Sequence, residues 1–317
     1  MTWFNNATLF RLTDAPDAIR LSEALAKRPF QPCMGLDWFS EGWVAPAIHL
    51  EEPVFATRGH MLVSLLREDK VLPPAVIRKA VDALVAEIEA KELRKVGRKE
   101  RLALKDQVTD DLLPRAFAKP SRVPALMAGG WLIADTGSAP RAEALVSKLR
   151  EALPPFPAAL PRTQIVPRTA MTDWLAAGEA PGAFELDEDA VLKDGSENGA
   201  EVRVSRINLT SDEIRQHIAT GKQATKLGLI WNEKIRFQLT DTLQLKRIQW
   251  LGVLQDEASQ AGDDRESLFE ATFILMSEEL GELVEALVEA LGGLEDSQAR
   301  PGAVSTTPAP MPVMSTP

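Results

Sequence analysis

Several residue types that carry protein chemistry are scarce in this sequence. Tyrosine is absent, cysteine occurs once (Cys33), and histidine occurs three times, at His49, His60 and His217. A single cysteine excludes an internal disulfide framework and indicates a reducing compartment. The histidines are far apart and give no zinc-ligand spacing, so neither a metal site nor a cofactor is predicted.

Targeting and membrane signals are missing as well. The N-terminal stretch MTWFNNATLFRL has no basic region followed by an apolar core, so we do not expect a signal peptide. No apolar run reaches the roughly 18 residues that a membrane-spanning helix needs. We therefore expect a cytoplasmic protein that has no membrane partner.

Motifs of the common enzyme classes are also absent. The sequence contains no G-x-x-x-x-G-K-[ST], no G-x-G-x-x-G and no G-x-S-x-G. The pairs Asp110-Asp111 and Asp263-Asp264 are candidate metal ligands, but neighbouring helical residues point about 100° apart and neither pair has a companion motif. A non-enzyme is favoured, with a magnesium-dependent nuclease or other nucleic-acid enzyme as the alternative. Cys33 is expected to be a buried structural cysteine rather than part of a catalytic Cys–His pair.

The net charge of −10 is unevenly distributed along the chain. Residues 255–296 hold thirteen acidic residues and one basic residue, Arg265, so this segment carries −12 and the remainder carries +2. Such asymmetry is typical of proteins that contact nucleic acid on one side. Two alternatives remain: the acidic residues solvate the outer face of a helix, or they bind a basic protein and make the chain an adaptor.

The most basic segment is residues 91–105, KELRKVGRKERLALK. It has seven lysines and arginines against Glu92 and Glu100, a local charge of +5. Concentrated positive charge on an acidic protein favours binding of a polyanion. Without a base-reading motif, the lysines and arginines predict contacts with the DNA backbone, strong salt dependence and little sequence preference.

The basic segment falls in a predicted helical hairpin. Pro73-Pro74 predicts the start of a long helix, because proline is tolerated in the first helical turn. Apolar residues from Ile77 to Ile88 recur on one face. Gly97 is the expected left-handed end of this helix, and a second helix is expected from Arg98 to about Leu113. The hairpin is predicted to project from the body with a charged tip.

The rest of the chain predicts strands and separate helices. Strands are expected over 3–12, 42–50, 60–67 and 131–135, and helices over 17–28 and 140–152. In a second unit, Thr210 and Glu213 form an expected capping box, and Asn232-Glu233 an expected hairpin turn. A strand over 243–250 and a final helix over 278–291 follow. This order predicts an α+β fold with mixed sheets.

Several sequence blocks together resemble the recombination-associated protein RdgC family. They are M-x-W-F-x-N, R-P-F-Q-P-C, G-W-V-A-P, K-V-L-P-P-A-V-I, L-K-D-Q-V, L-L-P-R-A-F, L-T-S-D-E-I…H-I-x-x-G-K-x-x-T-K-L and F-I-L-M-S-E-E-L…L-x-E-A-L-G-G. The similarity extends from about Met1 to Gly293. It implies a bacterial, ring-shaped homodimer whose positive central hole binds double-stranded DNA without sequence preference. It also implies a nucleoid-associated, non-enzymatic protein that opposes RecA filament function in DNA recombination.

The resemblance and the sequence pattern together define expected domains and sites. The expected central α+β domain comprises residues 1–74 and 115–168, and the expected hairpin tip comprises 75–114. A second α+β domain, the base, is expected over 169–294, and a disordered tail over 295–317. Phe117 and Arg206 are the expected contacts that close the dimer. The predicted DNA-binding residues are Lys91, Arg94, Lys95, Arg98, Lys99, Arg101, Lys105, Arg115, Lys119, Arg203, Arg206, Lys222, Lys226, Lys234 and Arg236.

Overall fold

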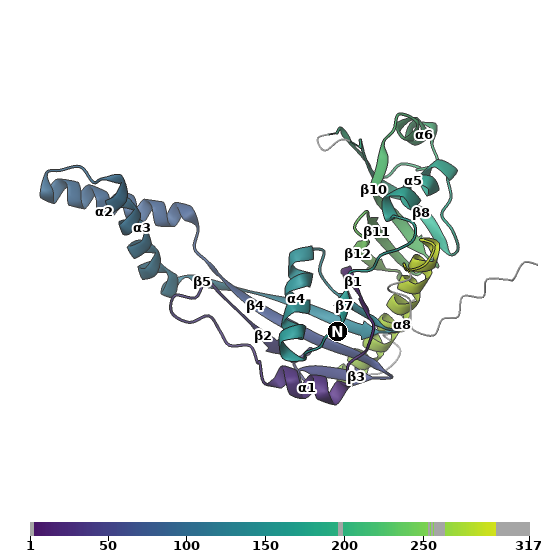
Figure 1. Cartoon of the computed structure of the whole chain (residues 1–317), viewed down its shortest axis with the longest axis horizontal. Coiled ribbons are helices and arrows are strands. Elements are labelled where there is room, and N and C mark those ends of the chain that lie inside the picture. Colours follow the sequence, from purple (N-terminus) through teal and green to yellow (C-terminus); the bar gives the residue numbers. More distant parts are fainter. Residues whose placement is uncertain (1–2, 196–198, 253, 255, 257–263, 296–317) are drawn as a thin grey trace, which may run out of the picture.

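A computed structural model describes residues 3–195, 199–252, 254, 256 and 264–295 of the 317-residue chain (Figure 1). Its strands form one 12-stranded sheet in the order β2-β4-β5-β6-β1-β12-β11-β10-β8-β9, with β3 beside β4 and β7 beside β1. The strands are β1 (Asn6–Leu12), β2 (Phe39–Val44), β3 (Val54–Thr57), β4 (His60–Val71), β5 (Phe117–Ala128), β6 (Trp131–Ala134), β7 (Ala158–Ala159), β8 (Phe184–Lys193), β9 (Glu201–Val204), β10 (Gln223–Trp231), β11 (Ile235–Thr240) and β12 (Gln244–Trp250).

The helices lie at the two faces and at one far end of this sheet. They are α1 (Ala18–Ala26), α2 (Pro74–Glu92), α3 (Arg98–Leu112), α4 (Ala139–Ala152), α5 (Pro167–Ala177), α6 (Asp212–Ala219) and α8 (Arg265–Ala290), with a 3-10 turn at Leu113–Arg115. The α+β class is confirmed. The prediction of mixed sheets is wrong, because every ladder between the named strands is antiparallel and all belong to one sheet.

The first strand joins the two halves of the sheet. Thr8 of β1 lies opposite Ala134 of β6 on one side and Gln244 of β12 on the other. Its side chain continues this connection, because the Thr8 hydroxyl donates to the carbonyl of Thr136 at 2.7 Å and accepts from Gln244 at 3.1 Å. One sheet therefore runs through both predicted α+β units, and their division into separate domains stays a prediction.

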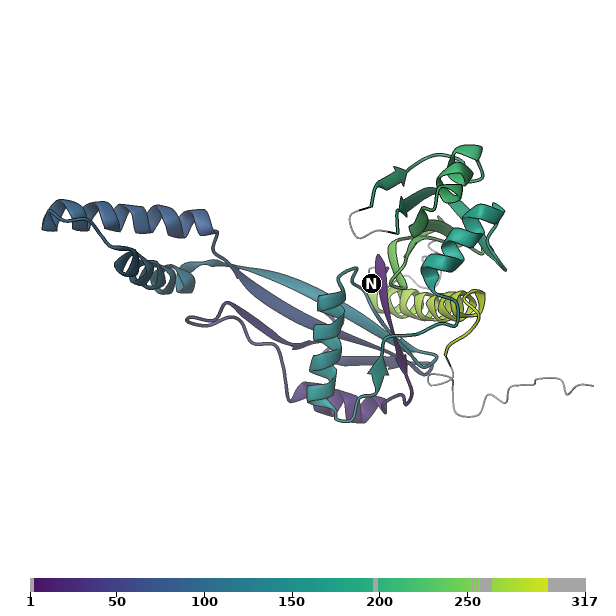
Figure 2. The ribbon, with the colours of Figure 1, turned by 45° about the horizontal axis from the view of Figure 1, so that its top comes forward.

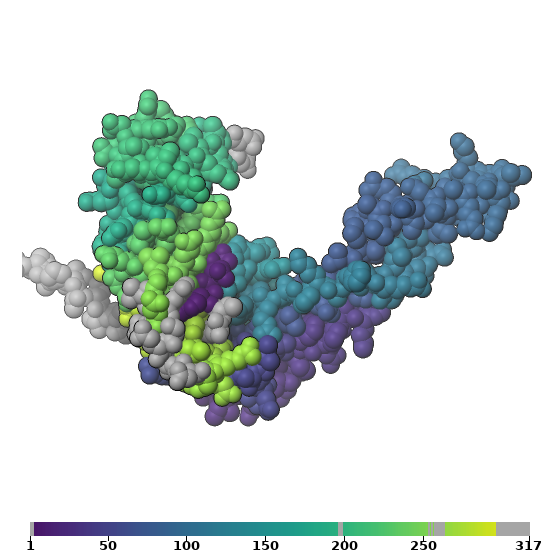
Figure 3. Space-filling view, turned by 180° about the vertical axis from the view of Figure 1, so that it is seen from behind, coloured from purple at the N-terminus to yellow at the C-terminus, as the bar shows by residue number. Residues whose placement is uncertain are grey.

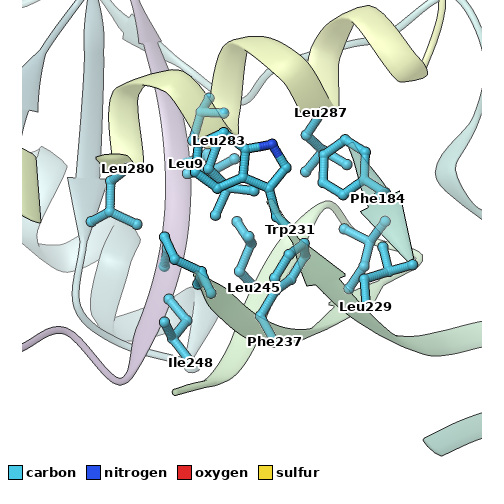
Figure 4. Packing of buried hydrophobic residues seen from close by; sticks show 14 of the residues in the cluster. Leu9, Phe184, Leu229, Trp231, Phe237, Leu245, Ile248, Leu280, Leu283 and Leu287 are labelled. Carbon is cyan, nitrogen blue, oxygen red and sulfur yellow. The ribbon is translucent and has the colours of Figure 1, made fainter. Parts of the chain in front are cut away.

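Two cores lie on opposite faces of the sheet. On one face α8 and α5 cover both halves, and Figure 4 shows Leu283 and Leu287 of α8 against Trp231 and Phe237. On the other face α1 and α4 cover only the central half, where Leu145 of α4 belongs to a second cluster. The alternation of side chains along each strand explains this arrangement, since successive residues point to opposite faces. Of the helices named above, none packs on the other face of the second half of the sheet.

The helical hairpin α2–α3 projects from the central half at the end of β4 and β5 (Figures 1 and 2). It has a small core of its own, which contains Ile77, Val81, Val85 and Val108. The predicted start of α2 at Pro74 and of α3 at Arg98 is confirmed. The hairpin and the second half of the sheet form two arms, and the space-filling view shows a wide hollow between them (Figure 3).

Several local predictions are wrong in detail. Gly97 is not the left-handed end of α2; it is the extended N-cap of α3, and Leu93 takes the left-handed conformation with a φ of 51°. The strand predicted over 42–50 is β2, which ends at Val44. The predicted disordered tail lies outside the described residues apart from Glu295.

The two helix predictions in the second unit are also corrected. Thr210 does not cap α6; Ser211 is the N-cap, and Thr210 instead bonds to the side chain of Asn208. The final helix starts at Arg265 rather than at 278, because Asp264 caps it by accepting from the N–H groups of Glu266 and Ser267.

Candidate nucleic-acid interface

The second half of the sheet presents a polar face toward the hollow. Figure 1 shows β10, β11 and β12 on the side that faces the hairpin, with α5 and α8 behind them. We call this surface the open face and define it by Lys226, Arg236, Gln238, Lys246 and Gln249. The strand register brings them together, because Gln238 lies opposite Lys246 and Arg236 lies opposite Gln249.

The open face carries positive charge that the protein only partly neutralises. Arg236 lies 3.5 Å from a carboxylate oxygen of Asp187 on β8. Lys226 and Lys246 make no ion pair with any residue that the structure describes. Phosphate groups bind lysines and arginines of this kind through charge and without reading bases. The glutamines beside them can donate further hydrogen bonds to phosphate or sugar oxygens.

A half-buried carboxylate lies at the seam between the two halves of the sheet. One oxygen of Asp135 accepts from the backbone N–H groups of Asn5, at 3.1 Å, and Asn6, at 2.9 Å. Burial raises the pKa of Asp135, and these two hydrogen bonds offset that effect only in part. Asp135 thus holds the segment before β1 to the end of β6, where β1 lies between the two halves of the sheet.

Part of the positive charge of the hairpin is neutralised within the hairpin. Lys91 pairs with Glu87 at 2.6 Å, Arg101 pairs with Asp82, and Arg94 forms a two-pronged pair with Glu100 as well as a contact with Glu92. Hydrogen bonding to Glu100 raises the pKa of Arg94 above its ordinary value. Residues 74–112 hold nine basic and eight acidic residues, so positive charge is concentrated at the tip and not along the whole hairpin.

The remaining basic side chains of the tip are available to a ligand. Among the described residues, no ion pair involves Lys95, Arg98, Lys99 or Lys105, and all four are exposed. Three of them, Arg98, Lys99 and Lys105, line a cleft of about 1200 Å³ between α2 and α3. Apolar residues line the same cleft, among them the half-exposed Trp38 of the body.

The base of the hairpin exposes an apolar side chain together with cations. Phe117 begins β5 opposite Val71 and is 88% exposed, and Lys119 follows opposite Asp69. Arg115 ends the 3-10 turn just before Phe117 and is exposed. An exposed phenylalanine of this kind favours contact with another molecule.

The other predicted DNA-binding residues have different surroundings. Arg203 pairs with Glu201 at 3.0 Å, and Lys222 lies 4.0 Å from Asp194. Arg206 is exposed in a loop, with a left-handed φ of 58°. Lys234 differs most, because its ammonium pairs with the buried Glu279 of α8 and therefore lies on the covered side of the sheet. Lys234 therefore does not share the open face with Arg236, since Lys234 belongs to the turn before β11.

Sequence reasoning missed three members of the open face, Gln238, Lys246 and Gln249. Lys246 falls in the strand predicted over 243–250 but was not predicted to contact DNA. The alternation of Gln244, Lys246 and polar Gln249 with buried Leu245 and Ile248 is the signal that marks this face of β12.

The residues considered for catalysis do not form a site in the described part of the chain. No group of three or more His, Cys, Asp or Glu side chains comes together there in a metal-binding arrangement. Asp110 and Asp111 are exposed on α3, and Asp263 lies outside the described residues. The thiol of Cys33 donates to the carbonyl of Glu68 at 3.2 Å, which is a structural contact of a half-buried cysteine. Of the helices the structure describes, none has the length and apolar character needed to cross a bilayer.

The fold and surface define an α+β protein with two arms around a hollow and a basic sheet face on one of them. A family model described as "Putative exonuclease, RdgC" matches residues 2–294. The chain is 54% identical to the "Recombination-associated protein RdgC" of Laribacter hongkongensis, over 92% of this chain and 98% of that protein. Proteins of the same name from Neisseria gonorrhoeae and Pseudomonas paraeruginosa are 45% and 38% identical, over 93% of this chain and 100% and 99% of theirs. The chain belongs to the RdgC family of recombination-associated proteins.

Proposed function

We propose that this protein binds double-stranded DNA in the hollow between its two arms, without reading the base sequence. The open face supports this proposal most directly, because it puts Lys226, Arg236 and Lys246 on a surface that none of the described helices covers, opposite the basic hairpin tip. A duplex between the two surfaces meets lysines and arginines from both sides. Such contacts neutralise phosphates and carry no sequence information.

A second copy of the chain closes the hollow into a ring in this proposal. Phe117 and Arg206 are the proposed contacts, at the base of the hairpin and at the outer end of the second arm. Encirclement adds topological retention to weak phosphate contacts, so that dissociation slows without any gain in sequence recognition. A ring on the duplex also covers the surface that a RecA filament needs, which links DNA binding to the recombination role in the names of the relatives.

A charge-neutralising variant of the open face tests the DNA site. The variant changes Lys226, Arg236 and Lys246 together to glutamine. The plot of log affinity against log salt is expected to become less steep by about 2.7, at about 0.9 per lost phosphate contact. The matched control changes Arg20, Lys27 and Arg58 to glutamine, which removes the same charge from exposed positions on α1 and the β3–β4 turn. An equal loss in both variants would refute a local site and leave only a net-charge effect.

Comparison of circular and linear duplexes tests the ring. The protein is expected to remain on a closed circle after a salt jump that releases it from linear DNA of equal length, because a ring leaves a linear duplex at its ends. Cutting the circle with a restriction enzyme should then release the protein. Equal dissociation from both forms would remove encirclement but not DNA binding.

A second candidate is a magnesium-dependent nuclease, which the description of the matching family model favours. Purified protein incubated with linear, nicked and supercoiled DNA and magnesium ions decides between the two. Time-dependent cleavage that chelation of the metal abolishes would establish the nuclease. Binding without cleavage on all three substrates is the expected result for the DNA-binding proposal.

A further inference from the structure

Three arginines adopt a backbone conformation that glycine favours and other residues rarely take. Arg58, Arg206 and Arg247 have φ values of 50°, 58° and 54°. Arg247 differs from the other two because it lies inside a strand. Lys246 of β12 faces Gln238 of β11, whereas Gln249 faces Arg236, so β12 has one residue more than β11 between these pairs. Arg247 is thus part of a β-bulge, the kind of irregularity that redirects a side chain.

The surroundings of Arg247 give no internal reason for this backbone strain. Its neighbour Ile248 is buried in the core beneath α8, and the N–H of Ile248 donates to Asn5 at 2.8 Å. Arg247 itself is exposed and makes no ion pair with the residues that the structure describes. A residue in this backbone conformation whose guanidinium makes no ion pair with the described residues favours a contact with another molecule.

We propose that Arg247 is a further DNA-contacting residue, which the bulge of β12 directs at a phosphate group beside Lys246. The covered side of β12 is filled by α8 and the core, so the exposed guanidinium reaches solvent on the side of the open face. A guanidinium can bind two phosphate oxygens at once, whereas the ammonium groups of Lys226 and Lys246 act as point charges. Arg247 therefore fixes the position of one strand of the duplex at the seam between the two arms. This inference rests on the proposed DNA-binding function.

Two substitutions of Arg247 separate its backbone from its charge. Arg247→Gly relieves the left-handed conformation and removes the charge, so the variant is expected to melt about 2 °C higher while its salt slope falls by about 0.9. Arg247→Gln keeps the strain and loses only the charge, so the same fall in slope is expected without the rise in melting temperature. A residue with a role in folding alone could not raise the melting temperature and weaken DNA binding when it is replaced by glycine.

Arg58→Gly is the matched control. Arg58 has the same backbone conformation, but its guanidinium lies 3.6 Å from Glu278 of α8, away from the open face. This variant is expected to bind duplex DNA with the salt slope of the parent chain. If Arg58→Gly reduced the salt slope as much as Arg247→Gly, the proposal would be overturned, because the loss of any exposed arginine would then have the same effect.

Failure of this inference is distinguishable from failure of the proposed function. If both Arg247 variants keep the parent slope while the Lys226, Arg236 and Lys246 variant loses slope, the open face binds DNA and Arg247 does not. If none of these variants changes the slope, the open face is not the DNA site at all. A lower slope in Arg247→Gly alone, with Arg247→Gln unchanged, would also overturn the proposal, since charge would then have no part in the effect.

Discussion

Replacement of Phe117 by alanine separates the proposed contact between copies from the stability of the chain. Phe117 is 88% exposed, so its removal leaves almost no cavity, and the free energy of unfolding is expected to change by less than about 0.5 kcal/mol. Full burial of one phenylalanine against a partner contributes about 1.5–3 kcal/mol. A two-fold interface buries the residue from both copies, so the loss is about 3–6 kcal/mol. The dimer dissociation constant should therefore rise roughly 10²- to 10⁴-fold.

Sedimentation velocity over a dilution series measures this change. Phe117→Ala is expected to shift from dimer to monomer at concentrations where the parent chain remains dimeric, with an unchanged denaturation midpoint. Ile48→Ala is the matched control, because Ile48 is 90% exposed but lies in the β2–β3 loop, beside α8. Identical dimerisation of Phe117→Ala and the parent chain would refute the placement of this residue in the interface, and an equal effect of Ile48→Ala would show that general surface hydrophobicity was responsible.

Three further predictions follow from the described contacts. The hairpin variant with Arg94, Lys95, Arg98 and Lys99 all changed to glutamine should lower the salt slope of DNA binding by about 2.7 rather than 3.6, because Glu92 and Glu100 already hold Arg94. Asp135→Asn should melt higher than the parent at neutral pH, since burial raises the pKa of Asp135; thermal melts at decreasing pH should show this advantage vanish as the pH falls through the raised pKa toward the ordinary value of 3.8. Gly42→Ala should cost about 2 kcal/mol or more in chemical denaturation, because its Cβ would lie 2.2 Å from the Cα of Phe30. Gly97→Ala has open space and should cost only about 0.5–1 kcal/mol, because alanine is the poorer N-cap of α3.

The elements predicted well are those with local signals. Pro73-Pro74 and the apolar period after it predict α2 because both act within a few residues, and the strand expected over 131–135 is β6, which follows the turn at Gly129-Gly130. Asn232 and Glu233 likewise take the positive φ values that a two-residue hairpin turn requires. The start of α8 was missed, although Asp264, which caps it by accepting from the N–H groups of Glu266 and Ser267, was a usable signal.

The features that could not be predicted depend on residues far apart in the sequence. The pairing of β1 with β12 joins Thr8 to Gln244, and no pattern in either strand identifies its partner. Lys234 shows the same limit at the candidate site, because its direction depends on Glu279 of a helix 45 residues further along the chain. The charge of the tip was visible in the sequence, but its partial neutralisation by Asp82 required α2 and α3 to be placed side by side, because Asp82 of α2 pairs with Arg101 of α3. The pair of Glu87 with Lys91, by contrast, joins residues four apart within α2.

The strand that joins both arms has a consequence for synthesis on the ribosome. The backbone N–H of Phe4, next to β1, donates to the sulfur of Met276 in α8, a contact that spans 272 residues. Leu9 of β1 and Leu283 of α8 likewise share one core. The segment around β1 is translated early, but it can pack only after α8 has been synthesised. Contacts between residues so distant in sequence form slowly. The sheet that joins the two arms therefore cannot be completed until nearly all of the chain has emerged, whereas the α2–α3 hairpin, which has its own small core, can form earlier.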